Sequence, residues 1–206
     1  MPTPSTAVPA DFASAAQALR SVTLRADLAA REIAPPERIA PHSVAFAAGV
    51  REGTGADKEP VLDSPAGAGR FVLMHDPDSA EEWGGHFRIV CYAQAPLELE
   101  IGVDPFISDV AWSWLIDALE SRGAQFGYIS GTATKVLSSS FGAIATRGDG
   151  AQIELRASWT PRGEDFTAHF EAWAELLCLL AGLPHEEGVA SLTHQRARAK
   201  RQAEAQ

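Results

Sequence analysis

Residues 75–86, HDPDSAEEWGGH, place two histidines, two aspartates and two glutamates within twelve positions. Imidazole and carboxylate groups are ligands for zinc, iron and manganese, and they also act as general acids and bases. His75, Asp76, Asp78 and His86 form the set that could hold a metal for a hydrolase or nuclease reaction. Their spacing matches neither a His-Glu-x-x-His helix nor an EF-hand loop.

Each polar residue of this stretch also has a local structural explanation. Asp76 and Pro77 are typical of the start of a turn, and Ser79 with Glu82 fits the capping box of a short helix. The glycine pair at 84–85 permits the positive φ needed to re-enter a strand. We therefore interpret residues 75–86 as a solvated connection between two strands, and we expect neither a metal nor another cofactor.

Other groups that do chemistry are scattered. Cys91 and Cys178 lie in apolar stretches, where burial raises a thiol's pKa and weakens it as a nucleophile. Residues 131–142, GTATKVLSSSFG, match neither a phosphate-binding loop nor a Gly-x-Ser-x-Gly elbow, and their alternation favours a strand. His42, His169 and His185 also occur singly, without a neighbouring partner for catalysis. The sequence therefore predicts no catalytic set.

Tryptophans mark the candidate partner surface. Trp83 lies among charges and glycines, where it either folds back onto the sheet or anchors a partner. A helix predicted over 109–122 has an apolar arc of roughly 200°, wider than one buried face requires. Trp112, Trp114 and Ile116 lie on that arc, and for Trp114 core packing and interface remain equal alternatives. The basic residues near the C-terminus are also candidates for partner contacts: Arg196, Arg198, Lys200 and Arg201.

Charge and composition exclude several classes of protein. The chain has 17 basic and 27 acidic residues, and residues 196–206 contain four of the basic ones and one acidic one. The remaining body is therefore strongly acidic and a poor surface for nucleic acid, which leaves only the basic tail as a possible contact. Two cysteines are no disulfide framework, and no basic leader or long apolar run indicates export or membrane insertion. We expect a cytoplasmic protein.

The elements that must position these residues follow from periodicity. Alternating apolar residues predict strands, and wider spacing with capping residues predicts helices, Asp11 and Ser108 being candidate N-caps. Residues 21–40 fit helix or strand. Helices are predicted at 11–20, 109–122 and 164–181, and strands at 43–50, 70–74, 86–93, 97–103, 125–137 and 152–159. The order, helix, strands, helix, two strands, helix, predicts an α+β domain with an antiparallel sheet of about five to seven strands and helices packed on it.

The domain boundaries are predicted from composition. Residues 1–10 are expected to form a disordered leader, 11–184 a single domain, and 185–206 a polar tail with a basic end. Within the domain, residues 52–69 contain glycines, prolines and mixed charges, and we expect them to form a mobile loop.

Several motifs resemble one family. They are HDP at 75–77, the block at 95–124 with its Trp-Ser-Trp helix, the Gly-Thr-x-Thr strand at 131–134, IELRASWTP at 153–161, and EAWAELLCLLAGLP at 171–184. Together they are similar to an actinobacterial family catalogued as domain of unknown function number three thousand. The resemblance implies a cytoplasmic actinobacterial protein, carries over no catalytic residue, and gives an associational hint toward RNA metabolism. The element order is also similar to type III secretion chaperone-like folds, which are dimers that bind proteins.

The leading hypothesis is a non-enzymatic interaction or adaptor domain. It would dimerise or bind a protein partner through the tryptophan-bearing helix and the 75–86 loop. The alternatives are a metal-dependent hydrolase or nuclease built on the 75–86 set, and an RNA-metabolism accessory protein acting through the basic tail.

Overall fold

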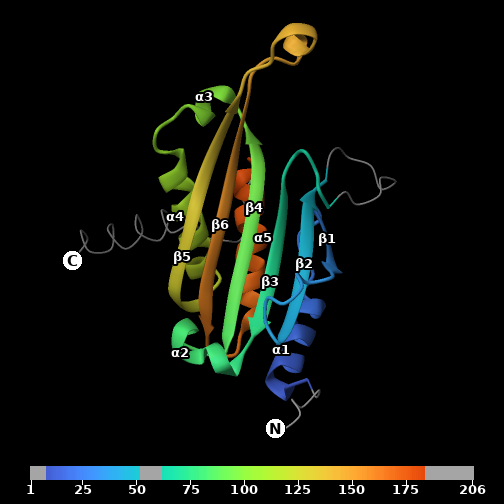
Figure 1. Ribbon diagram of the computed structural model, residues 1–206, viewed down its shortest axis with the longest axis vertical. Coiled ribbons are helices and arrows are strands. Elements are labelled where there is room, and N and C mark those ends of the chain that lie inside the picture. Colours follow the sequence, from blue (N-terminus) through green and yellow to red (C-terminus); the bar gives the residue numbers. More distant parts are fainter. Residues whose placement is uncertain (1–7, 52–61, 184–206) are drawn as a thin grey trace, which may run out of the picture.

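One six-stranded antiparallel sheet organises the chain in a computed structural model that describes residues 8–51 and 62–183 (Figure 1). Its strand order is β1-β2-β3-β4-β6-β5, so only the last two strands leave the sequence order. The strands are β1 (Leu28–Ile33), β2 (His42–Val50), β3 (Ala68–His75), β4 (Phe87–Leu97), β5 (Gln125–Ser138) and β6 (Gly150–Arg162). The predicted α+β class and sheet are confirmed.

Three helices lie on the same face of the sheet: α1 (Ala10–Ser21), α4 (Ile107–Ser121) and α5 (Phe166–Leu180). α5 is central and contacts four strands and both other helices. Alternate strand residues point into this layer because successive side chains of a strand face opposite sides. The largest fully buried side chains are Trp159, Trp173, Phe71, Leu19, Leu73, Ile89, Leu115, Leu119, Ile153, Leu155, Leu176 and Leu177.

On the opposite face of the sheet, the described residues form a small apolar cluster of Ala45, Val72 and Met74, against which Trp83 packs. Beside it, Arg88 on β4 donates hydrogen bonds to Oγ of Ser158 (2.6 Å), Oγ1 of Thr160 (3.1 Å) and the carbonyl of Tyr128 (2.9 Å). This arginine therefore joins β4, β6 and β5 on a face that the long helices leave open (Figure 1).

The strand predicted over 97–103 is wrong. β4 ends at Leu97, and α3 (Leu99–Gly102) follows as a single helical turn. The apolar alternation was misleading because Leu99, Ile101 and Val103 are all exposed, so the pattern has no buried face. Gly102 packs so closely against β6 that a Cβ there would lie 2.3 Å from the Cβ of Ala151. That contact holds the turn against the sheet.

Several predicted caps are also wrong. Pro9 occupies the N-cap of α1, while Asp11 lies inside the helix; Phe106 rather than Ser108 precedes α4. The capping box of Ser79 with Glu82 does not form. Instead Asp76 caps η1 (Pro77–Ser79), accepting from the backbone N–H of Asp78 (3.0 Å) and the hydroxyl of Ser79 (2.8 Å). α2 (Ala80–Trp83) follows, and Gly84 ends it at φ 73°.

The segments whose structure the sequence left open are now assigned. Residues 21–40, whose sequence fitted either a helix or a strand, contain β1. β3 begins at Ala68, inside the segment expected to be a loop, whereas residues 52–61 lie outside the described residues, as do 1–7 of the leader and the tail. Within 8–51 and 62–183, no helix combines the length and the apolar character needed to cross a bilayer.

Candidate functional site

The outer edge of the sheet is a candidate binding surface. β5 is 14 residues long and lies at the end of the strand order, so only its inner side pairs, with β6. Its sequence, QFGYISGTATKVLS, contains one charged residue, Lys135, whose ammonium group donates to the carbonyl of Asp104 (2.8 Å). Unpaired backbone groups on such an edge are a template for a further strand.

The β5–β6 hairpin extends past the end of β4 as an arm, residues 138–150 (Figure 1). Its tip contains η2 (Gly142–Arg147), and every residue from 141 to 150 is exposed. Phe141 is 78% exposed and Ile144 is 48% exposed, so both apolar side chains face solvent at the tip. Large apolar residues held in water in this way are typical of a contact surface.

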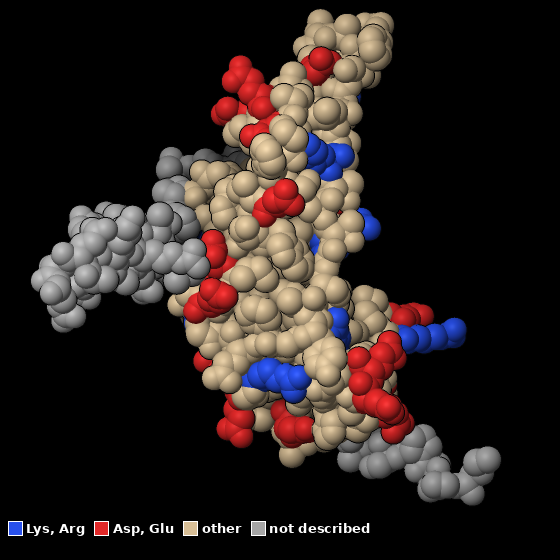
Figure 2. All heavy atoms as spheres, turned by 90° about the vertical axis from the view of Figure 1, so that its left-hand side faces the viewer, with Lys and Arg blue, Asp and Glu red and all other residues tan. Residues whose placement is uncertain are grey.

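More exposed apolar residues lie where the arm leaves the body. α3 contacts both β5 and β6, which places its apolar side chains beside the hairpin. We call the whole set the apolar end; its members are Leu99, Ile101, Val103, Phe106, Val110, Val136, Leu137, Phe141 and Ile144. Carboxylates lie beside the apolar end, because Glu98 and Glu100 flank Leu99 and are exposed. Figure 2, which shows the left-hand side of Figure 1, has acidic side chains gathered near its top.

The tryptophans singled out from the sequence are half-buried. Trp112 and Trp114 on α4 pack partly against the core, Ile116 is partly buried, and a Cβ at Gly131 of β5 would lie 2.6 Å from the ring of Trp112. Trp83 rests partly on the small open-face cluster. The predicted tail contacts at 196–201 lie outside the described residues. The partner role of these tryptophans stays a prediction.

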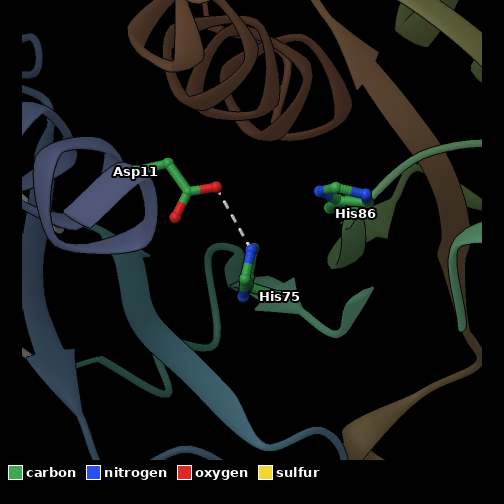
Figure 3. A group of neighbouring side chains, drawn as sticks. All are labelled: Asp11, His75 and His86. Carbon is green, nitrogen blue, oxygen red and sulfur yellow. Dashed lines mark ion pairs between the residues drawn. The ribbon is translucent and has the colours of Figure 1, made fainter. Parts of the chain in front are cut away.

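A second candidate site lies at the opposite end of the sheet from the arm. Asp11 of α1, His75 at the end of β3 and His86 before β4 present one ligand atom each, all within 4.8 Å of one another (Figure 3). Nε2 of His75 lies 3.3 Å from Oδ2 of Asp11. His75 is 2% exposed, whereas Asp11 and His86 are exposed, so the cluster opens to solvent on one side.

The hairpin between β3 and β4 brings the two histidines together. His75 pairs with Phe87 in the register, and the N–H of Asp76 donates to the carbonyl of His86 (2.9 Å). His75 continues the alternation of Phe71 and Leu73, so its ring points toward the helix layer where α1 supplies Asp11. Among the described residues, neither Asp76 nor Asp78 joins this cluster, because Asp76 is used as the cap of η1.

His75 is buried, but its ring nitrogens lack hydrogen-bond partners among the described residues. The contact of its Nε2 with Asp11 lacks hydrogen-bond geometry. A buried polar atom without a partner costs about 1–3 kcal/mol. The ring is otherwise surrounded by aromatic groups, with centroids 4.7 Å from Phe87, 6.0 Å from Phe12 and 6.1 Å from His42.

Two other groups that can be reactive in proteins are enclosed. Nδ1 of His169 accepts a hydrogen bond from the indole N–H of Trp159 (3.1 Å), and burial lowers the pKa of His169 to about 4 against the opposing charge of Asp165. Burial raises the pKa of the Cys91 thiol to about 12. Neither is suited to act as a base or nucleophile at neutral pH.

Comparison with known proteins identifies a family and nothing finer. A family model described as a protein of unknown function (DUF3000) matches residues 8–190. This is the family that the sequence motifs resemble. No curated protein and no solved structure matches the chain, so the likeness to type III secretion chaperones remains an analogy.

Proposed function

The chain belongs to the DUF3000 family, and we propose that it acts as a protein-interaction domain that pairs with a second copy of itself along β5. The observation that carries this proposal is the free edge of β5. Natural edge strands are protected by charges, prolines, bulges or short length. Over residues 130–138, β5 pairs with β6 without a bulge, contains no proline, and has Lys135 as its one charge.

A second copy fits this edge for reasons of geometry. Two antiparallel β5 strands related by a two-fold axis would continue the sheet from one copy into the other. Two-fold symmetry is the commonest symmetry of protein dimers. The same axis would direct each arm along the body of the other copy. Phe141 and Ile144, which find no cover on their own chain within the described residues, would then gain a surface to pack against.

Charge sets the conditions for this pairing. β5 contains no acidic residue, and its one cation, Lys135, donates to the carbonyl of Asp104, so strand pairing brings no carboxylates of β5 together. Glu98 and Glu100 beside the apolar end would come closer to an acidic partner, and salt screens such repulsion over about 10 Å at 0.1 M. We therefore expect association to strengthen as salt is raised from low concentration.

The α4 residues predicted for partner contact fit beside this interface. α4 packs on β5, and Trp114 follows the exposed Val110 by one helical turn on the same side of the helix. Trp112 lies next to Gly131 of β5 and would flank the proposed contact, and Ile116 follows Trp112 by one helical turn. A non-enzymatic role agrees with the enclosure of His169 and Cys91, and a reduced, buried Cys91 agrees with a cytoplasmic location.

The test is the mass of the full chain in solution, measured by light scattering after size exclusion. We expect the wild type to have twice the mass of one chain, and the double variant Phe141→Glu/Ile144→Glu to shift to a folded monomer. Val8→Glu is the matched control, since Val8 is an exposed apolar residue (57%) outside the apolar end. A wild-type monomer at all concentrations, or a double variant that dimerises like wild type, would contradict the proposal.

A further inference from the structure

We propose that Asp11, His75 and His86 form a binding site for a first-row divalent transition metal, with Zn²⁺ as the ion to test. Nothing in this inference depends on dimerisation, because the cluster lies at the end of the sheet away from the arm (Figures 1 and 3).

The distances suit a metal. Tetrahedral ligands about 2.0–2.2 Å from zinc lie roughly 3.3–3.5 Å from one another. Nε2 of His75 and Oδ2 of Asp11 are already 3.3 Å apart. The third ligand atom, on His86, is within 4.8 Å of both, and its side chain is exposed and therefore able to turn inward.

The buried histidine is the second, independent observation. His75 is 2% exposed, and its ring nitrogens have no hydrogen-bond partner in the described part of the chain. A metal bound at Nε2 would satisfy this atom without a proton, and the Asp11 carboxylate would balance part of the ion's charge. The same ion explains why a carboxylate lies 3.3 Å from a buried imidazole nitrogen without the geometry of a hydrogen bond.

The donor set indicates which metals fit. Two imidazoles and one carboxylate suit zinc, iron or manganese, whereas Mg²⁺ and Ca²⁺ prefer sites made of oxygen ligands only. Three protein ligands leave at least one coordination position open toward solvent, where Asp11 and His86 are exposed. Such an ion would also join α1 to the hairpin of β3 and β4, because its ligands come from these separate elements.

The experiment is a calorimetric titration of the full chain, stripped with a chelator, with Zn²⁺ and separately with Mg²⁺. We expect one Zn²⁺ per chain in the wild type and no binding of Mg²⁺. Asp11→Asn and His86→Ala change exposed residues, so folding should survive, and each should weaken Zn²⁺ binding by about a hundredfold or more. Asp78→Asn is the matched control, an exposed carboxylate from the same hairpin that the structure leaves outside the cluster, and it should bind as the wild type does.

A second readout separates this site from other histidines. His42, His169, His185 and His194 are unchanged in every variant, so binding to them would persist in all of them. Because a ligand of the folded state stabilises it, Zn²⁺ should raise the Tm of the wild type and of Asp78→Asn but not of His86→Ala. Absence of Zn²⁺ binding by the wild type, or equal affinity in Asp11→Asn and His86→Ala, would overturn the assignment.

Discussion

Protonation of His169 should destabilise the fold in mildly acidic solution. Its ring is 0% exposed, and one nitrogen accepts the indole N–H of Trp159. Burial lowers the pKa in the folded chain to about 4, whereas an unfolded histidine titrates near pH 6.5. As pH falls, the unfolded chain therefore takes up the proton first, and the free energy of unfolding decreases.

The size of the effect follows from the two pKa values. Each unit of difference corresponds to 1.36 kcal/mol, and the loss develops between pH 6.5 and 4. At pH 5 the unfolded histidine is almost fully protonated and the folded one mostly neutral, which gives a loss of about 2 kcal/mol relative to pH 7. At pH 4 the loss reaches about 3 kcal/mol.

Urea unfolding at pH 7 and pH 5 measures this loss in the wild type and in His169→Gln. The glutamine amide can accept from Trp159 but does not titrate, while the other histidines and the carboxylates are common to both proteins. We expect the wild type to lose about 2 kcal/mol more than the variant between the two pH values. Equal losses in the two proteins would show that His169 does not control the acid response.

Two further predictions concern packing. Gly69→Ala should destabilise the chain by about 1–3 kcal/mol in urea unfolding, because a Cβ there would lie 2.8 Å from the carbonyl oxygen of Tyr92 and 2.9 Å from the ring of Trp173. Gly150→Ala is the control, because a Cβ at Gly150 would have no atom within 4 Å. An equal loss of stability in the two variants would contradict the packing argument. Cys91 has a thiol pKa of about 12 and is 1% exposed, so it should react with a thiol reagent at pH 8 only after urea unfolds the chain. Fast reaction of Cys91 in the native protein would show that the core around it opens.

The strands and long helices could be predicted because the apolar residues that face the core recur with a regular period. β6 alternates buried apolar residues with more exposed ones, the larger apolar residues of β2 recur at every second position toward the helix layer, and α5 begins at the cap Asp165. The stretch 97–103 shows the same alternation without burial. Periodicity cannot distinguish these cases, because it reports which residues are apolar and not which of them meet a partner.

The candidate sites depended on contacts that the sequence does not show. Asp11 and His75 are 64 residues apart in the chain and meet only because α1 lies over the end of β3. One local signal was available: His75 continues the phase of Phe71 and Leu73, so extending the predicted strand by one residue would have made it a buried histidine. The exposed edge of β5 follows from the strand order, since β6 takes the place between β4 and β5.

Hydrogen exchange of the β5 backbone tests the central claim most directly. In a monomer the outward N–H groups of this edge strand exchange with solvent, whereas pairing with a second β5 would protect them. We predict that exchange over residues 130–138 slows as protein concentration rises, and that Phe141→Glu/Ile144→Glu removes this dependence. Rapid exchange of those amides at concentrations where the wild type is dimeric would contradict the account, since the dimer would then use another surface.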